Sequence, residues 1–245
     1  MKPFLLLASR PEDAAADGEY EAVLRFAGLR RTELRRVRLE QRPLGELRLA
    51  DYSGLIMGGS PFNSSDPVEA KSEIQRRVEA ELSNLLDAVV AADFPMLGAC
   101  YGVGTIGTHE GAVVDRTYSE PVGPVAVTLT AAGRSDPLFG VLPLEFEAFV
   151  GHKEAVRELP PHAVRLASSA ACPVQAFRVG SNVYATQFHP ELDVDGIVTR
   201  IDVYKNAGYF PPEEAEKIKE RVRSSAVRHP PAVLRRFVER YAVPA

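Results

Sequence analysis

The sequence is poor in several features that mark particular classes of protein. Its 245 residues include only two cysteines and no tryptophan. Two cysteines in so long a chain cannot form the disulfide framework of a small secreted protein. The apolar run near the amino terminus, Phe4 to Ala8, is too short for a membrane span or the core of a signal peptide. We therefore expect a cytoplasmic protein with no membrane partner.

Positive charge is not in excess either. The chain has 29 lysines and arginines against 33 aspartates and glutamates, a formal net charge of -4. Nucleic-acid-binding proteins usually present a basic surface, so we expect no nucleic-acid partner. The sequence has no internal repeat, no low-complexity linker and no Gly-x4-Gly-Lys loop of the kind that binds ATP phosphates.

Strand-like and helix-like segments alternate along the first hundred residues. "PFLLLAS", "SGLIMGG" and "FPMLGAC" have the continuous apolar character of buried strands. Apolar residues recur at three- and four-residue steps from Val68 to Val89, which predicts a long helix over one face of a parallel sheet. Short β-like runs between Val113 and Phe188 predict added antiparallel strands, and the last fifty residues have helical periodicity.

Cys100 lies in an unusual turn, Gly98-Ala99-Cys100-Tyr101-Gly102, between a predicted strand and a predicted helix. This spacing is typical of a nucleophile held on a strained turn at the edge of a sheet. The amino terminus of the following helix would favour the thiolate and could bind an oxyanion. A buried cysteine that only packs is an equally good interpretation of the turn taken alone.

The same region contains "GVGTIG", Gly102 to Gly107, a Gly-x-Gly-x-x-Gly pattern after a strand. In dinucleotide-binding folds this pattern opens a helix long enough to cross back over the sheet. Here a new strand begins at about Gly111, so too little helix remains. Nucleotide binding is therefore the less favoured alternative.

A nucleophilic thiol needs a base, and "TQFHPE" supplies one. His189 follows a predicted strand, and Glu191 lies two residues further on, so an extended backbone can bring both side chains to one side. The carboxylate can then orient the imidazole toward a thiol. The other four histidines lack such a neighbour and show no metal-ligand spacing, and Cys172 fits a packing role.

Four motifs in order, "GLIMGGSP", "PMLGACYG", "EAFVGHKEAVRELP" and "YATQFHPE", resemble those of the class I glutamine amidotransferases, in particular GMP synthetase-like domains that occur as separate chains. The similarity extends from about Lys2 to Glu191. It implies an α/β, flavodoxin-like three-layer domain with a central, mostly parallel sheet, added antiparallel strands and a C-terminal helical tail. We expect residues 1–200 to form this domain and residues 201–245 to be a helical extension packed on it.

The resemblance also implies a role for individual residues. Cys100 would be the nucleophile, His189 the base and Glu191 the residue that holds the imidazole. The backbone N–H groups of Gly59 and Tyr101 would form the oxyanion hole. Six further residues would bind the substrate: Gly58, Ser60, Gly104, Gly151, His152 and Lys153.

The implied reaction is hydrolysis of a γ-glutamyl amide, glutamine or an analogue, through a thioester that releases ammonia. It needs no metal and no organic cofactor. Because the chain lacks an ATP-binding loop, any ammonia-accepting synthetase would be a separate protein. The alternative is a catalytically weak or inactive protein of the same fold with a binding or regulatory role.

Two positions depart from the family pattern. The family usually has a glutamine four residues after the nucleophile, where this chain has Gly104, and Lys153 replaces a residue without a side chain. The site would then accept a larger γ-glutamyl compound that fills the space over Gly104, or would need a partner to complete it. Either way, we expect the isolated chain to hydrolyse free glutamine poorly.

Overall fold

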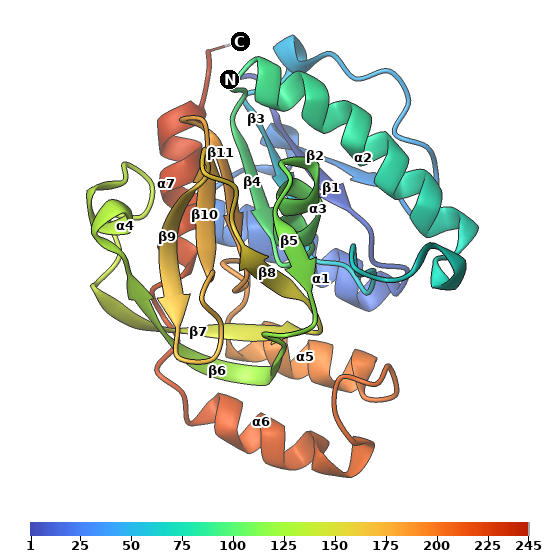
Figure 1. Cartoon of the computed structure of the whole chain (residues 1–245), viewed down its shortest axis with the longest axis vertical. Helices are drawn as coiled ribbons and strands as arrows, with labels where there is room; N and C mark the ends of the chain where they lie inside the picture. The colour runs from blue at the N-terminus through green and yellow to red at the C-terminus, as the bar shows by residue number, and fades with distance from the viewer. Residues whose placement is uncertain (245) are drawn as a thin grey trace.

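A nine-stranded mixed sheet forms the centre of the computed structural model, which describes residues 1–244 (Figure 1). The first five strands in spatial order run parallel, and the other four are antiparallel additions. The order is β2 (Leu34–Arg38), β1 (Phe4–Ala8), β3 (Gly54–Met57), β4 (Met96–Ala99), β11 (Val183–Thr186), β10 (Ala176–Val179), β9 (Val164–Ser169), β6 (Glu120–Leu129) and β7 (Glu145–His152). A separate antiparallel pair joins β5 (Val113–Asp115) to β8 (Ala155–Glu158). The expected mostly parallel sheet with antiparallel additions is confirmed.

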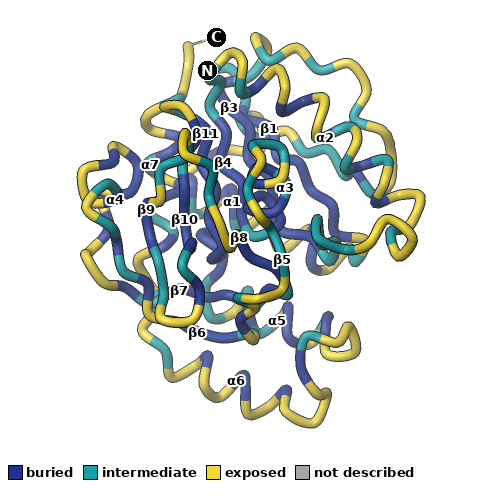
Figure 2. Tube along the Cα trace, in the orientation of Figure 1, coloured by how far each residue is buried: buried dark blue, intermediate teal, exposed yellow. Residues whose placement is uncertain are grey.

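Helices cover both faces of the parallel strands and complete three layers. The helices α1 (Asp13–Ala27) and α7 (Pro231–Tyr241) pack on one face, and α2 (Glu73–Ala91) and α3 (Tyr101–His109) pack on the other. Successive strand residues point to opposite faces. Leu6 of β1 therefore belongs to the first core, whereas Leu5 and Leu7 belong to the second. Figure 2 shows that the central strands are buried along their length.

A third apolar cluster lies where α5 (Val194–Tyr204) and α6 (Ala215–Arg223) pack beside β6 and β7 (Figure 1). It joins Phe149 of β7 to Ile201 of α5 and Val222 of α6. The expected division between residues 200 and 201 thus falls inside a helix. Because α7 packs into the main core, the C-terminal helices share the apolar interior of the sheet domain.

Some helix limits differ from the sequence expectation. Val68 and Ile74 were expected on the buried stripe of the long helix, but both are exposed. The α2 helix begins only after Ser72, whose side chain accepts a hydrogen bond from the Gln75 N–H and caps the helix. The remaining short elements are α4 (Ala131–Ser135) and four 3₁₀ turns, Arg31–Glu33, Leu49–Asp51, Val68–Ala70 and Pro212–Glu214.

The "GVGTIG" segment lies within α3 itself, and this helix has only nine residues. Its glycines therefore do not form the turn that precedes a helix in dinucleotide-binding folds. Of the helices in residues 1–244, none combines the length and apolar character needed to span a bilayer.

Candidate active site

Cys100 occupies a strained turn between β4 and α3. Its backbone has φ +53° and ψ -85°, a conformation that residues other than glycine rarely adopt. The Cys100 N–H donates to the Thr186 carbonyl of the neighbouring β11 at 2.7 Å, which fixes the turn against the sheet. A Cβ on Gly98 would lie 2.9 Å from the Cα of Gly102, so these glycines allow the helix to approach the strand. The expected strained turn between a strand and a helix is therefore present at Cys100.

His189 and Glu191 follow the carboxyl end of β11, the strand beside β4. The His189 N–H donates to the Phe149 carbonyl at 3.0 Å, and Nδ1 of the ring lies 2.8 Å from Oε1 of Glu191. Both side chains are buried, and His189 lines the same cavity as Cys100. Residues 89 positions apart in the sequence thus meet in one cavity, as the sequence predicted.

The surroundings of Cys100 oppose the thiolate that the helix amino terminus was expected to favour. Although the residue is only partly buried, desolvation raises the pKa of its thiol to about 12, and nearby Arg10 opposes the shift. Burial also lowers the pKa of His189, and Arg200 and Arg10 lower it further, against the effect of Glu191. Both pKa shifts favour the uncharged forms, a thiol and an imidazole that can accept its proton.

Arg200 is a site residue that the sequence interpretation missed. Its Nη2 donates to Oε1 of Glu191 at 2.9 Å, and its Nη1 lies 3.0 Å from Nδ1 of His189. Burial alone would raise the pKa of Glu191, but His189 and Arg200 lower it, so Glu191 is a carboxylate. A signal was present: Arg200 lies three residues after Ile197 and four before Tyr204, on the buried stripe of α5, where an unpaired charge is costly.

Arg10, which lines the cavity, and Glu19 extend this network. Nε of Arg10 donates to Oε1 of Glu19 at 3.0 Å, and Nη1 donates to the Tyr204 hydroxyl at 3.2 Å. Arg200 approaches the same Glu19 oxygen at 3.4 Å. Burial would lower the pKa of Arg10, but Glu19 and Tyr204 raise it above its usual range. Two cations and two carboxylates therefore surround the imidazole on its buried side.

The two backbone N–H groups expected to form the oxyanion hole lie where a helix begins and where a strand ends. Tyr101 is the first residue of α3, and Gly59 follows β3. Within residues 1–244, neither N–H donates to a protein acceptor. A Cβ on Gly59 would collide with Nη2 of Arg10 and would lie 2.9 Å from Cε1 of His189. Only glycine fits this position beside the imidazole.

Four of the six expected substrate-binding residues line cavities that Cys100 also lines: Ser60, Gly151, His152 and Lys153. Gly58 and Gly104 do not. The space over Gly58 is filled by the Glu19 carboxylate.

The space over Gly104 is not open, contrary to the sequence interpretation. It is filled by the Glu154 carboxylate and by the Ser64 hydroxyl, 2.8 Å from the position of a Cβ. Glu154 is held there by the N–H groups of Ser64 and Ser65, at 2.9 and 2.7 Å. A larger substrate therefore cannot occupy this space unless Glu154 moves.

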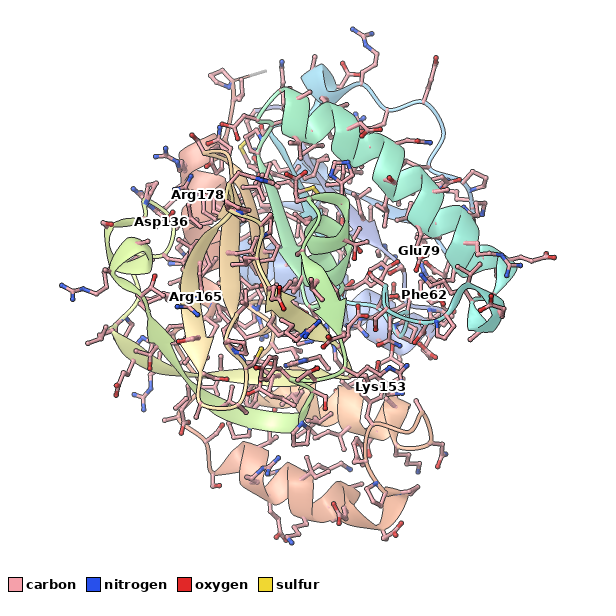
Figure 3. All side chains as sticks on the ribbon, viewed as in Figure 1. Phe62, Glu79, Asp136, Lys153, Arg165 and Arg178 are labelled. Atoms are coloured by element: carbon pink, nitrogen blue, oxygen red, sulfur yellow. The ribbon has the colours of Figure 1, made fainter. Side chains whose placement is uncertain are left out.

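Lys153 contacts the connection that follows α5, residues 205–211 (Figure 3). Its Nζ donates to the Ala207 carbonyl at 3.2 Å and lies 4.5 Å from the centroid of the Tyr209 ring. Tyr209 lines both cavities beside Cys100. The segment after residue 200, expected to be a helical extension packed on the domain, thus contributes part of the cavity wall.

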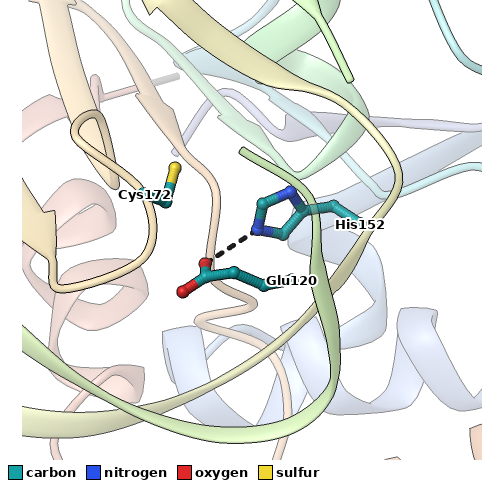
Figure 4. Close-up of side chains that lie close together, drawn as sticks. All are labelled: Glu120, His152 and Cys172. Atoms are coloured by element: carbon teal, nitrogen blue, oxygen red, sulfur yellow. Dashed lines mark hydrogen bonds and ion pairs between the residues drawn. The ribbon is translucent and has the colours of Figure 1, made fainter. Parts of the chain in front are cut away.

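Glu120, His152 and Cys172 also converge, with ligand-type atoms within 4.8 Å of one another (Figure 4). Sequence reasoning missed this cluster because the residues come from three distant segments. Both ring nitrogens of His152 face oxygen acceptors, Oε2 of Glu120 at 2.9 Å and the Glu154 carbonyl at 2.8 Å. Burial raises the pKa of Cys172 to about 12. Because both imidazole nitrogens are already hydrogen-bonded and burial favours the thiol form of Cys172, the cluster fits a structural role better than a metal site.

Comparison with known proteins places this architecture in a family. The family model described as "Glutamine amidotransferase class-I" matches residues 20–195. The chain belongs to the class I glutamine amidotransferase family. Among its relatives, a glutamine-hydrolysing GMP synthase subunit of Methanocaldococcus jannaschii is 31% identical over 152 residues, which cover 61% of this chain and 71% of the relative.

The protein of the same description from Thermoplasma acidophilum is 29% identical over 146 residues, 59% of this chain and 66% of the relative. Against the longer glutamine-hydrolysing GMP synthase of Thermosipho africanus, the match is 30% over 107 residues and spans 20% of that protein. The chain thus spans about two thirds of the two shorter relatives and a fifth of this longer one.

Solved structures agree on the fold. A glutamine amidotransferase from Thermotoga maritima aligns with a TM-score of 0.77 at 20% identity and 98% coverage of both chains. Another from Methylobacillus flagellatus has a TM-score of 0.73 at 19% identity and covers 100% of this chain and 97% of that one. The flavodoxin-like assignment is confirmed, with the C-terminal helices inside the aligned region.

Proposed function

We propose that this protein hydrolyses the side-chain amide of glutamine or a related γ-glutamyl amide and releases ammonia, with Cys100 as nucleophile. The observation that carries this proposal is a single cavity lined both by Cys100, on a strained strand-to-helix turn, and by His189, which pairs with Glu191. Membership in the class I amidotransferase family supports the choice of a glutamine-type amide over other acyl groups.

The first half of the reaction begins with both partners neutral. This step uses the tautomer in which Nδ1 carries the proton and donates it to Glu191, so Nδ1 accepts no hydrogen bond from Arg200. His189 then accepts the Cys100 proton at Nε2 as the sulfur attacks the amide carbon. The carbonyl oxygen becomes an oxyanion, to which the N–H groups of Gly59 and Tyr101 would donate. The imidazolium then gives its proton to the amide nitrogen, ammonia departs, and a thioester remains.

The second half uses water in place of the thiol. His189 takes a proton from the water as its oxygen attacks the thioester, and a second oxyanion forms at the same position. The Cys100 sulfur then leaves and recovers a proton from the imidazolium. The net change is amide plus water to carboxylic acid plus ammonia, and Glu191 stabilises the imidazolium in both halves.

A separate synthetase as the ammonia acceptor is part of this proposal. Two relatives are described as one subunit of a glutamine-hydrolysing GMP synthase, which supports a chain that works beside another protein. The family model ends at residue 195 and so does not include the helices that follow, which means that the partner's contacts here can differ.

A specific observation favours a second candidate, a protein with little activity until a partner binds. Tyr209 lines both cavities beside Cys100, and Glu154 fills the space over Gly104, where the family has a glutamine side chain. Both features restrict entry of a substrate in the structure of the free chain.

Ammonia release separates the two candidates. Wild type and Cys100→Ser are incubated with L-glutamine and with γ-glutamyl amides, and ammonia is measured at steady state. Cys100-dependent release supports the hydrolase, and we expect kcat/KM for free glutamine below about 10⁴ M⁻¹s⁻¹, the lower end of ordinary enzymes. Equal release by both proteins would overturn the proposed function. A wild type that reacts at Cys100 with a glutamine-like electrophile but releases no ammonia would favour the second candidate.

A further inference from the structure

Arg10 is the cavity residue with an unused hydrogen-bond donor. Its side chain is 6% exposed, and it lines the cavity that contains Cys100. Nε is bound to Glu19 and Nη1 to the Tyr204 hydroxyl. Within residues 1–244, Nη2 donates to no protein acceptor. Because a guanidinium is planar, the two bound nitrogens fix the direction in which the third one points.

Nη2 is directed toward the reacting groups. A Cβ on Gly59 would collide with this nitrogen and would lie 2.9 Å from Cε1 of His189. The free donor, the Gly59 backbone and the edge of the imidazole therefore meet at one part of the cavity wall. Nη2 is not sealed off inside the protein: it is open to the cavity that Arg10 lines, so a ligand in that cavity can supply its acceptor.

The two ends of the site differ in charge. At the Gly104 end, the Glu154 carboxylate lines the smaller cavity beside Cys100. At the Gly59 end, Arg10 presents a cation with a free donor. An anionic group of a ligand is repelled at the first end and attracted at the second.

We propose that Arg10 is an anion-binding residue of this site, whose Nη2 donates to an anionic oxygen of the substrate. That oxygen is either a carboxylate of the γ-amide or the oxyanion formed when Cys100 attacks. The inference rests on the proposed function for the identity of the ligand, but carboxylate binding itself needs no turnover.

The first experiment measures ligand binding through protection of the Cys100 thiol, a readout that does not depend on ammonia release. Cys100 is alkylated with iodoacetamide, a neutral reagent, in the presence of glutaramate, a γ-amide with one carboxylate, or glutaramide, its neutral counterpart. Protection is quantified by mass spectrometry for wild type and Arg10→Lys, which keeps the charge beside Glu19 but loses the planar fork. Arg178→Lys is the matched control, because Arg178 pairs with Asp136 at 3.0 Å outside the cavity (Figure 3).

If Arg10 binds the carboxylate, Arg10→Lys needs about tenfold more glutaramate for half protection, whereas protection by glutaramide and the Arg178 control stay unchanged. If Arg10 binds the oxyanion, protection is unchanged but kcat for both amides falls by about 10²-fold, the loss typical of one oxyanion donor. A folded Arg10→Lys variant with neither effect overturns the inference. Should Arg10→Lys not fold, Arg10→Met combined with Glu19→Gln removes the buried ion pair as a unit and undergoes the same tests.

The outcome is independent of the proposed hydrolysis. Arg10-dependent protection by glutaramate in a protein that releases no ammonia would reject the proposed function and retain the anion site. Cys100-dependent ammonia release, with neither release nor protection affected by the Arg10 substitution, would retain the proposed function and reject the anion site.

Discussion

Arg200 of α5 donates from Nη2 to Oε1 of Glu191 at 2.9 Å, while its Nη1 lies 3.0 Å from Nδ1 of His189. The carboxylate that orients the imidazole is therefore held by a helix outside the sheet. A cation this close stabilises the Glu191 carboxylate and opposes protonation of His189. The C-terminal segment thus influences the charge state of a pair that the sheet positions.

We predict that Arg200→Gln moves the acid limb of the pH–rate profile to higher pH. Activity needs neutral His189, so it falls as the pH drops through the His189 pKa, which lies below its ordinary value in wild type. Removal of the Arg200 charge raises that pKa, and activity is then lost at a higher pH. The measurement is kcat/KM against pH for the folded variant. An unchanged acid limb would show that Arg200 is only structural.

His189→Ala should reduce the rate of ammonia release more than Glu191→Gln does. Loss of the imidazole removes the proton acceptor, and we expect ammonia release to fall by about 10³-fold or more. Glu191→Gln keeps an oxygen that can accept from Nδ1, so a measurable residue of activity remains. Steady-state assays at saturating amide compare the two. Wild-type turnover in the histidine variant would remove this pair from the mechanism.

The two cysteines should react differently with a glutamine-like electrophile. Burial raises the pKa of both thiols to about 12, so the difference comes from access and from the base, not from a resting thiolate. Cys100 lines the cavity beside His189, whereas Cys172 is 0% exposed. We expect modification of Cys100 alone near neutral pH, and much slower modification in His189→Ala. Peptide mass spectrometry checks this, and equal labelling of both thiols in folded protein contradicts it.

Local patterns were sufficient to predict the strained turn at Cys100 and the pairing of His189 with Glu191. The "GACYG" spacing dictates the strained backbone at Cys100, and the two-residue step to Glu191 places its carboxylate beside the imidazole. The parallel strands were recognisable because each is a continuous apolar run between turn residues.

The contacts made by distant segments could not be predicted in this way. Arg10 and Arg200 are separated by 190 positions, and only the packing of α5 against α1 brings them to the same Glu19 oxygen. At Gly104 the sequence interpretation was wrong for the same reason, because it did not include a distant segment. The missing side chain indicated an open space, but Glu154, fifty residues later, fills it. The sequence shows that Gly104 has no side chain, but only the fold shows that the Glu154 carboxylate occupies the space beside it.

Gly104→Gln should destabilise the protein instead of restoring a family-like site. The new side chain would displace the Glu154 carboxylate from the Ser64 and Ser65 N–H groups. We expect a loss of about 1–3 kcal/mol in the free energy of unfolding, as for overpacked interiors. The double variant Gly104→Gln with Glu154→Ala should recover part of this loss because it removes the competing group. Denaturant unfolding of the single and double variants measures the coupling, and strictly additive losses would contradict it.

Lys153→Ala should make Cys100 react faster with neutral alkylating reagents. Lys153 holds residues 205–211 beside the cavity through a hydrogen bond to the Ala207 carbonyl and a cation–π contact with the Tyr209 ring. These two contacts together stabilise the covered state by about 1 kcal/mol, so their loss should increase the fraction of open protein, and the alkylation rate, about fivefold. Lys205→Ala, which removes an exposed lysine from the same connection, is the control and should leave the rate unchanged. Iodoacetamide modification of Cys100 is followed by mass spectrometry at constant pH. Equal rates in wild type and Lys153→Ala would show that Tyr209 does not limit access to the thiol.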